Sequence, residues 1–188
     1  MKKLFPLFAF FLIISIISCN GGKSNSTIGQ SKDSDAVEAD ASDSTIFGVC
    51  GESTGMSTMQ LLTDAGDTLD LLIDENPEQP VVKGGVFAGD KMAVTAVKEN
   101  GEWIATNAIN LSSLIGKWTS IDKNFEILEG GVVKSNVKAE SEPWTSWKIY
   151  NCKLILNRDT FDVDNLGADS LYLENDKGIY TFKRLKEK

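Results

Sequence analysis

Four aspartates that stand close together near the C-terminus are the side chains best suited to metal or acid–base chemistry. They are Asp159, Asp162, Asp164 and Asp169, with Asn165 and Gly167 between them. Oxygen ligands at short spacings are typical of calcium loops, but the distal glutamate of the EF-hand pattern is absent here. Alternation with Phe161 and Val163 places Asp162 and Asp164 on one strand face, which we expect to face solvent. We therefore predict no metal site and interpret these carboxylates as solvated strand and turn residues.

Other kinds of catalytic centre find little support in the sequence. The chain contains no histidine, the commonest general base and the commonest metal ligand of proteins. No serine stands in a Gly-x-Ser-x-Gly setting, and no phosphate-binding glycine loop precedes a helix. Two carboxylates about 5 to 10 Å apart could serve a glycosidase, but a chain with 27 acidic residues always offers such pairs. We predict that the protein is not an enzyme and holds no cofactor.

The cysteine with a chemical role of its own is Cys19. Lys2 and Lys3 precede an apolar run over residues 4–17, which is too short for a bilayer-spanning helix of about 20 residues and fits a signal peptide. The run ends in Ile16-Ile17-Ser18-Cys19, which resembles the bacterial lipobox, whose cysteine is acylated and becomes the first residue of the mature protein. We expect residues 1–18 to be a lipoprotein signal peptide and Cys19 to anchor the chain to the cell envelope, at the outer membrane.

The charge of the chain limits its partners. The formal net charge is −8, and removal of residues 1–18 with their two lysines makes it more negative. An acidic protein is repelled by phosphate backbones and by anionic headgroups. We therefore expect no nucleic-acid partner, and contact with a membrane only through the N-terminal lipid.

Residues 19–44 contain almost nothing that could be buried. Serine, glycine, asparagine and aspartate dominate them, so burial cannot offset the entropy lost on ordering. We interpret this segment as a disordered tether between the lipid and the fold, with a reach of about 25 to 30 Å.

Beyond the tether, apolar and polar residues alternate with period two, which is typical of half-buried strands. In the first half, for example, Leu69, Leu71 and Ile73 share a face opposite Asp70. Runs of this kind cover residues 46–52, 56–63, 67–74, 91–98 and 102–110, separated by turns that contain glycine. Five short strands predict a small OB-like β-barrel over residues 45–110.

A helical turn at residues 110–115 marks the expected domain boundary near Leu111. Alternation then resumes at Trp118 and continues almost to the C-terminus. The runs cover residues 125–128, 132–138, 145–150, 153–157, 161–164, 170–174 and 178–185. This order predicts an antiparallel meander over residues 111–188, and an all-β protein as a whole.

The second half resembles a known family. Its opening, Gly116-Lys117-Trp118, is similar to the Gly-x-Trp that begins the first strand of lipocalin-like domains, and it is followed in the same order by Trp147, by Lys153-Leu154-Ile155-Leu156 and by Asp169-Ser170-Leu171-Tyr172-Leu173. Together these segments resemble the short lipocalin-like domains of Bacteroides-type lipoproteins, some of which carry a small barrel in front. The resemblance implies a lipocalin-like β-barrel at the cell envelope. It implies no settled activity, and the domain is about half the length of a full lipocalin.

Tryptophans are the candidate ligand contacts. We expect Trp118 and Trp147 to pack in the core, as buried tryptophans usually do. Trp144 follows Pro143 and lies three residues before Trp147, so a regular strand would place it on the opposite, exposed face. We therefore predict a packed barrel in which Trp144 holds a ligand at the mouth or on the outer surface.

Cys50 and Cys152 are the two remaining cysteines. Export would allow them to form a disulfide, but they fall in two different predicted domains, and a disulfide needs Cα atoms within about 7 Å. We favour two free thiols.

These observations favour a lipid-anchored binding or interaction module for a small apolar molecule, a glycan or a partner protein. The alternative is a structural or inhibitory envelope protein that docks a partner protein and binds no small molecule. An exposed aromatic patch beside a cavity would favour the first hypothesis. A flat polar surface over a filled core would favour the second.

Overall fold

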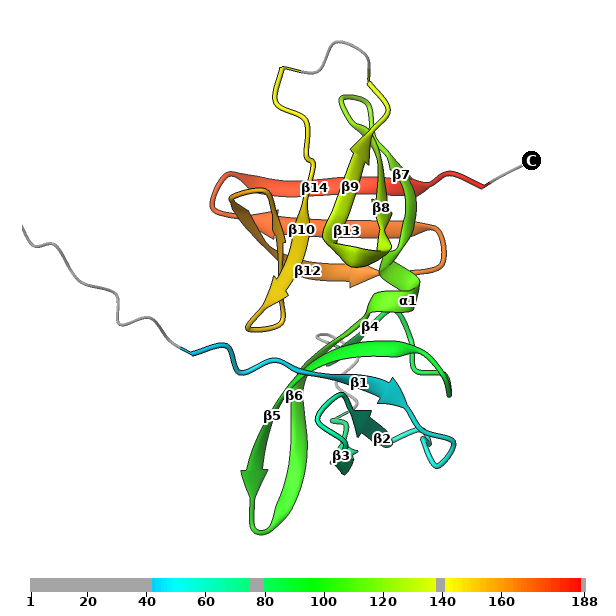
Figure 1. Ribbon diagram of the computed structural model, residues 1–188, viewed down its shortest axis with the longest axis vertical. Coiled ribbons are helices and arrows are strands. Elements are labelled where there is room, and N and C mark those ends of the chain that lie inside the picture. The colour runs from blue at the N-terminus through cyan, green and yellow to red at the C-terminus, as the bar shows by residue number, and fades with distance from the viewer. Residues whose placement is uncertain (1–41, 75–79, 138–140, 187–188) are drawn as a thin grey trace, which may run out of the picture. The chain divides into compact units, whose positions relative to one another are not determined.

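The computed structural model describes residues 42–74, 80–137 and 141–186. They form two β-sheets, which are joined by one short helix (Figure 1). The prediction of an all-β protein built from two small barrels is confirmed. The predicted signal peptide, Cys19 and most of the predicted tether lie outside the described residues.

The first sheet closes into a five-stranded barrel. Its strands are β1 (Ile46–Cys50), β2 (Thr58–Thr63), β3 (Thr68–Leu72), β4 (Val82–Lys83), β5 (Lys91–Glu99) and β6 (Glu102–Asn110). The strand order is β3-β2-β1-β5-β6-β4, and a parallel pairing of β3 with β6 closes the barrel. The short β4 adds to the outer side of β6. Alternate apolar residues fill the interior, among them Met59, Leu61, Leu71, Met92 and Val94.

Helix α1 (Leu111–Leu114) joins the two sheets and is fixed by Asn110. The Asn110 side chain is fully buried, and its Oδ1 accepts a 2.8 Å hydrogen bond from the backbone N–H of Ser113, which caps the helix. Its Nδ2 donates to the carbonyl of Gly85 at 3.0 Å and to Oδ2 of Asp90 at 2.6 Å. Asn110 thus ties the end of β6 to the segment that precedes β5.

The second sheet is an eight-stranded meander. Its strands are β7 (Gly116–Thr119), β8 (Asn124–Leu128), β9 (Val132–Ser135), β10 (Trp147–Tyr150), β11 (Lys153–Leu156), β12 (Asp159–Leu166), β13 (Ser170–Asn175) and β14 (Gly178–Arg184). The order is β10-β11-β12-β13-β14-β7-β8-β9. Between β9 and β10 a single bridge, Val132 with Ser146, brings the two outer strands together. The second sheet is therefore a nearly closed antiparallel barrel. Each strand overlaps a predicted run, but β9 and β10 are shorter than the predicted ranges 132–138 and 145–150, and β12 is longer than 161–164.

The two sheets share part of one hydrophobic core. Ala93 of β5 and Ile109 of β6 belong to the same buried cluster as the interior of the second barrel. The thiol of Cys152, in the β10–β11 turn, donates to the carbonyl of Ala93 at 3.2 Å. At the surface Lys91 and Glu129 form a 2.9 Å ion pair. The turns at this end of the second barrel are consequently held against the first.

Both described cysteines are free thiols, as predicted, and the structure shows that both are buried. Burial raises the pKa of Cys152 to about 11 from an ordinary value of 9.0, because the thiolate is desolvated. Between pH 9 and 11 the Cys152 thiol therefore stays protonated in the folded state, whereas it loses its proton in the unfolded chain. The stability linked to this group is fully present below about pH 9 and is lost as the pH rises towards 11.

We predict that Cys152→Ala removes part of the loss of stability between pH 9 and 11. The measurement is the urea unfolding midpoint of both proteins at several pH values. Between pH 9 and 11 the unfolding midpoint of the wild type should fall more steeply with pH than that of the variant. Below pH 9 the two midpoints should change with pH in the same way. Equal slopes in the alkaline range would contradict the linkage.

Candidate functional site

The meander leaves one end of the second barrel open. In an up-and-down arrangement successive connections alternate between the two ends. One end carries the turns at residues 129–131, 151–152 and 167–169, next to α1 and the contacts with the first barrel. The other end, called the open end below, is formed by the connections at residues 120–123, 136–137 with 141–146, 157–158 and 176–177. Among the residues that the structure describes, the cavities of this barrel lie at the open end and in its side.

A cavity of about 690 Å³ lies at the open end. We call it the mouth cavity. Three aromatic side chains line it, those of Trp144, Phe161 and Tyr180. The polar side chains around it are Asp122, Lys123, Ser141, Glu142, Asn157, Arg158, Asp159, Asn175 and Lys177. The mouth cavity therefore places the half-buried Tyr180 and two buried aromatic rings beside hydrogen-bond donors and acceptors of both charges.

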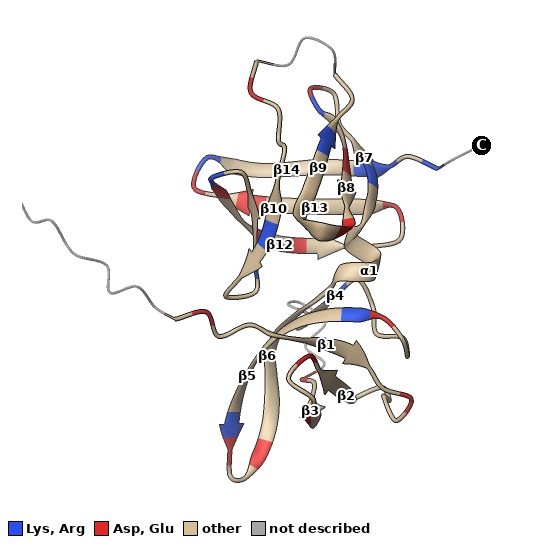
Figure 2. Cartoon of the chain, in the orientation of Figure 1, with Lys and Arg blue, Asp and Glu red and all other residues tan. Residues whose placement is uncertain are grey.

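The charged groups around the mouth cavity differ in how they are engaged. Lys177 contacts Asp159 at 3.3 Å, and this contact, chiefly its hydrogen bond, raises the pKa of Lys177. No ion pair engages Arg158 within the described residues, and Arg158 is exposed. Figure 2 shows that acidic and basic residues are interspersed along the chain. Arg158 is therefore the cation of this region best placed to meet a polar ligand.

Trp144 lies inside the barrel, and our prediction that it is exposed is wrong. Its side chain is only 6% exposed. The indole meets Phe125 edge to face with ring centroids 5.1 Å apart, and Phe161 at 5.8 Å. The Nζ of Lys123 lies 4.3 Å from the centre of the ring. The prediction assumed that residues 144 and 147 lie on one regular strand, where they would face opposite sides. Strand β10 begins only at Trp147, so Trp144 belongs to an irregular segment that is free to turn inwards.

Trp118 and Trp147 are structural, to different degrees. Trp118 is fully buried, and its Nε1 donates to the carbonyl of Leu114 at 2.9 Å. Trp147 is half-buried at the gap between β9 and β10, where its Nε1 donates to the carbonyl of Leu128 at 2.7 Å. Trp118 therefore fixes the start of β7 against α1, whereas Trp147 links β10 to the end of β8.

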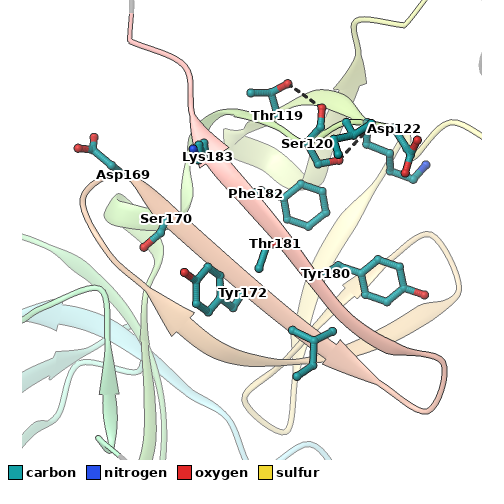
Figure 3. Close-up of a pocket in the computed structure, with 13 residues that line it drawn as sticks. Thr119, Ser120, Asp122, Asp169, Ser170, Tyr172, Tyr180, Thr181, Phe182 and Lys183 are labelled. Atoms are coloured by element: carbon teal, nitrogen blue, oxygen red, sulfur yellow. Dashed lines mark hydrogen bonds between the residues drawn. The ribbon is translucent and has the colours of Figure 1, made fainter.

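A second, larger cavity of about 1070 Å³ opens in the wall of the barrel beside the mouth. We call it the side slot. Residues 119–123 form one wall, and β14 with part of β13 forms the other. Figure 3 shows Phe182 and Tyr180 on the side of β14 that faces Ser120 and Asp122, with Tyr172 on the opposite side. The side slot and the mouth cavity share Asp122, Lys123 and Tyr180, so they adjoin each other.

The aspartates singled out in the sequence do not converge on one point. Asp162 pairs with Lys153 at 2.7 Å, and Asp169 pairs with Lys186 at 3.2 Å. Asp162 and Asp164 are exposed, as alternation predicted, while Phe161 and Val163 point into the core. Within the described ranges no three acidic or cysteine side chains are grouped as metal ligands. Asp159 lines the mouth cavity and Asp169 lines the side slot, whereas Asp162 and Asp164 line neither.

Comparison with known proteins adds no assignment. No family model matches the chain, and neither a curated protein nor a solved structure is significantly similar to it. The one α-helix of the described residues is a single turn, and none of them forms a helix suited to cross a membrane.

Proposed function

We propose that this protein is a lipid-anchored envelope lipoprotein whose second barrel binds a glycan or another small molecule with an apolar face at its open end. The mouth cavity carries the proposal, because it brings the half-buried Tyr180 together with polar groups such as the exposed Arg158 and the half-buried Asp159. Binding sites for small molecules usually combine an apolar lining with a few polar groups in this way. The packed aromatic core beneath Trp144 supports a ligand held at the mouth rather than deep in the barrel.

The proposed address rests on the N-terminal sequence. Lys2, the apolar run and the Ile-Ile-Ser-Cys ending at Cys19 resemble a lipoprotein signal. In the proposed architecture the first barrel is OB-like and the second lipocalin-like. The closure of five strands through the parallel β3–β6 pairing and the meander that closes through β14 and β7 support these comparisons.

We predict that Cys19→Ala abolishes lipid attachment and membrane retention and leaves the fold unchanged. The lipid would be joined to a residue outside both barrel cores, so the substitution should not alter packing. Metabolic labelling with palmitate, followed by membrane fractionation, measures the effect. Labelling of the variant at the wild-type level would contradict the lipobox assignment.

Ligand binding can be tested with Arg158→Ala. We expect a glycan that contacts the open end to bind this variant about tenfold more weakly, since one charge-assisted hydrogen bond contributes about 1.5 to 3 kcal/mol. The measurement is a glycan array, followed by titration of the best glycan by NMR. Lys134→Ala, an exposed cation on β9 away from the mouth cavity, is the matched control.

Three outcomes of this experiment are informative. Shifts at Tyr180 and Arg158 that saturate with the glycan would support the proposal. Binding of a fatty acid such as palmitate, with no glycan binding, would favour the purely apolar ligand instead. Equal affinity of Arg158→Ala and Lys134→Ala for every probe would mean that the open end is not the site.

A further inference from the structure

Strand β14 has a free edge beside the side slot. On one side β13 pairs with it from Ser170 with Lys183 to Asn175 with Gly178, without interruption. On the other side β7 pairs with β14 only at Lys183 and Arg184. After Thr119 the chain turns away into the loop that leads to β8, so the residues of β14 nearer the open end lack a strand on this side.

The backbone hydrogen bonds on either side of β14 identify which of its N–H and C=O groups are unpaired. The Arg184 N–H donates to the carbonyl of Asp169 on the β13 side at 3.0 Å, and the Leu185 N–H donates to the carbonyl of Lys117 on the β7 side at 2.9 Å. Successive residues of a strand direct their backbone groups to opposite sides. Ile179 and Thr181 therefore point their N–H and C=O groups towards the side slot. Within the described residues these four groups have no hydrogen-bond partner.

The sequence of this edge does nothing to prevent pairing. Natural edge strands are commonly interrupted by lysine, proline or a bulge, or are very short. Here the edge reads Ile179-Tyr180-Thr181-Phe182, four β-branched or aromatic residues with high strand propensity. The register with β13 is regular along this stretch. An unprotected edge of this kind is a template for one more strand.

The side slot determines what can pair there. Its opposite wall is the segment of residues 119–123, so a second folded sheet approaching the edge would meet this loop. A single extended chain has no neighbouring strand and avoids that obstacle. The half-buried Tyr180 faces into the same space (Figure 3), and an apolar side chain of an incoming strand would pack on it. The room between the turn after Asn175 and the pairing at Lys183 corresponds to about five residues at about 3.4 Å each.

We infer that the side slot binds an extended segment of a partner protein, which adds as a strand to the free edge of β14. Main-chain hydrogen bonds to Ile179 and Thr181 would supply affinity, and an apolar side chain packed on Tyr180 would supply specificity. This inference does not rest on the proposed glycan function, because its hydrogen bonds are made by Ile179 and Thr181, which line the side slot and not the mouth cavity; Tyr180 lines both.

The test is amide hydrogen exchange, measured by NMR on the full chain with a synthetic peptide, acetyl-Val-Thr-Val-Thr-Val-amide, as the probe. In the free chain we expect the amides of Ile179 and Thr181 to exchange rapidly, and those of Tyr180 and Phe182 slowly. The peptide should slow exchange at Ile179 and Thr181 by about tenfold or more. The same peptide methylated at every backbone nitrogen should have no effect.

Thr181→Pro removes one of the unpaired donors from an edge position, where proline is tolerated. We expect this variant to lose binding by about tenfold, whereas Thr181→Val keeps the N–H and binds like the wild type. Protected amides in the free chain would mean that the edge is already covered, and would overturn the inference. Equal effects of the two peptides, or equal binding by both variants, would also overturn it. If Thr181→Pro does not fold, the comparison of the two peptides on the wild-type chain decides whether a strand pairs with the edge of β14.

Discussion

Trp144→Ala should destabilise the protein by about 3 to 5 kcal/mol, the usual cost of truncating a fully buried aromatic side chain. The indole is 6% exposed and lies in a cluster of edge-to-face rings with Phe125, Phe161 and Phe182. Removing it would leave a cavity in the middle of these rings, and each would lose a favourable contact. Urea unfolding followed by circular dichroism measures the change.

Trp147→Ala is the matched comparison and should cost only about 1 to 2 kcal/mol. Its side chain is half-buried, so less apolar surface returns to water, and one hydrogen bond, to the carbonyl of Leu128, is lost. Trp144→Phe should fall between wild type and Trp144→Ala, because a smaller ring keeps part of the packing. A larger loss for Trp147→Ala than for Trp144→Ala would show that Trp144 is not the centre of the core.

The contrast between Trp144 and Trp147 shows what alternation can predict. The strands were predictable because each barrel buries one face, so residues such as Leu171 and Leu173 on β13 point inwards by periodicity alone. Trp144 was mispredicted because parity applies only within a regular strand, and residues 141–146 are irregular apart from one bridge. The aromatic cluster depends on contacts between strands far apart in sequence, which no local pattern encodes.

The side slot was beyond prediction for a different reason. The sequence of β14 (Gly178–Arg184) alternates in the same way whether it has a neighbour on one side or on both. Its free edge follows from the early end of β7 at Thr119, and local sequence predicts the ends of elements poorly. The mouth cavity likewise depends on which connections meet at one end of the meander. Counting strands could have grouped Arg158 with Lys177, since both lie in turns that an up-and-down order places at the same end.

The Gly-x-Trp segment has a structural role that depends on Arg184. The guanidinium lies 4.1 Å from the centre of the Trp118 ring. Its nitrogens donate to the carbonyl of Ala168 at 2.7 Å, to that of Ile115 at 3.0 Å and to that of Ser113. A Cβ at Gly116 would come within 2.5 Å of the same guanidinium. Gly116 therefore leaves the space that Arg184 needs, and Trp118 supplies the surface on which it stacks.

Arg184→Lys should cost about 2 to 4 kcal/mol of stability although it keeps the positive charge. A lysine ammonium lacks the planar fork that reaches three carbonyls and stacks on an indole. It would leave carbonyls at the end of α1 and in the β12–β13 turn without their donors, and hydrogen bonds to charged groups contribute about 1.5 to 3 kcal/mol each. Burial, opposed by the nearby Asp169, lowers the pKa of Arg184 from its ordinary value, because the guanidinium is partly desolvated, and the charge therefore depends on these acceptors.

Lys183→Met is the control for this prediction, since Lys183 is the neighbouring residue on β14 and its side chain is exposed. It should change stability by less than about 0.5 kcal/mol. Denaturant unfolding of the two variants and the wild type, with tryptophan fluorescence as a second signal, gives the comparison. If Arg184→Lys proves as stable as Lys183→Met, the guanidinium does not hold β14 to α1, and the closure of the barrel rests on the short β7–β14 pairing alone.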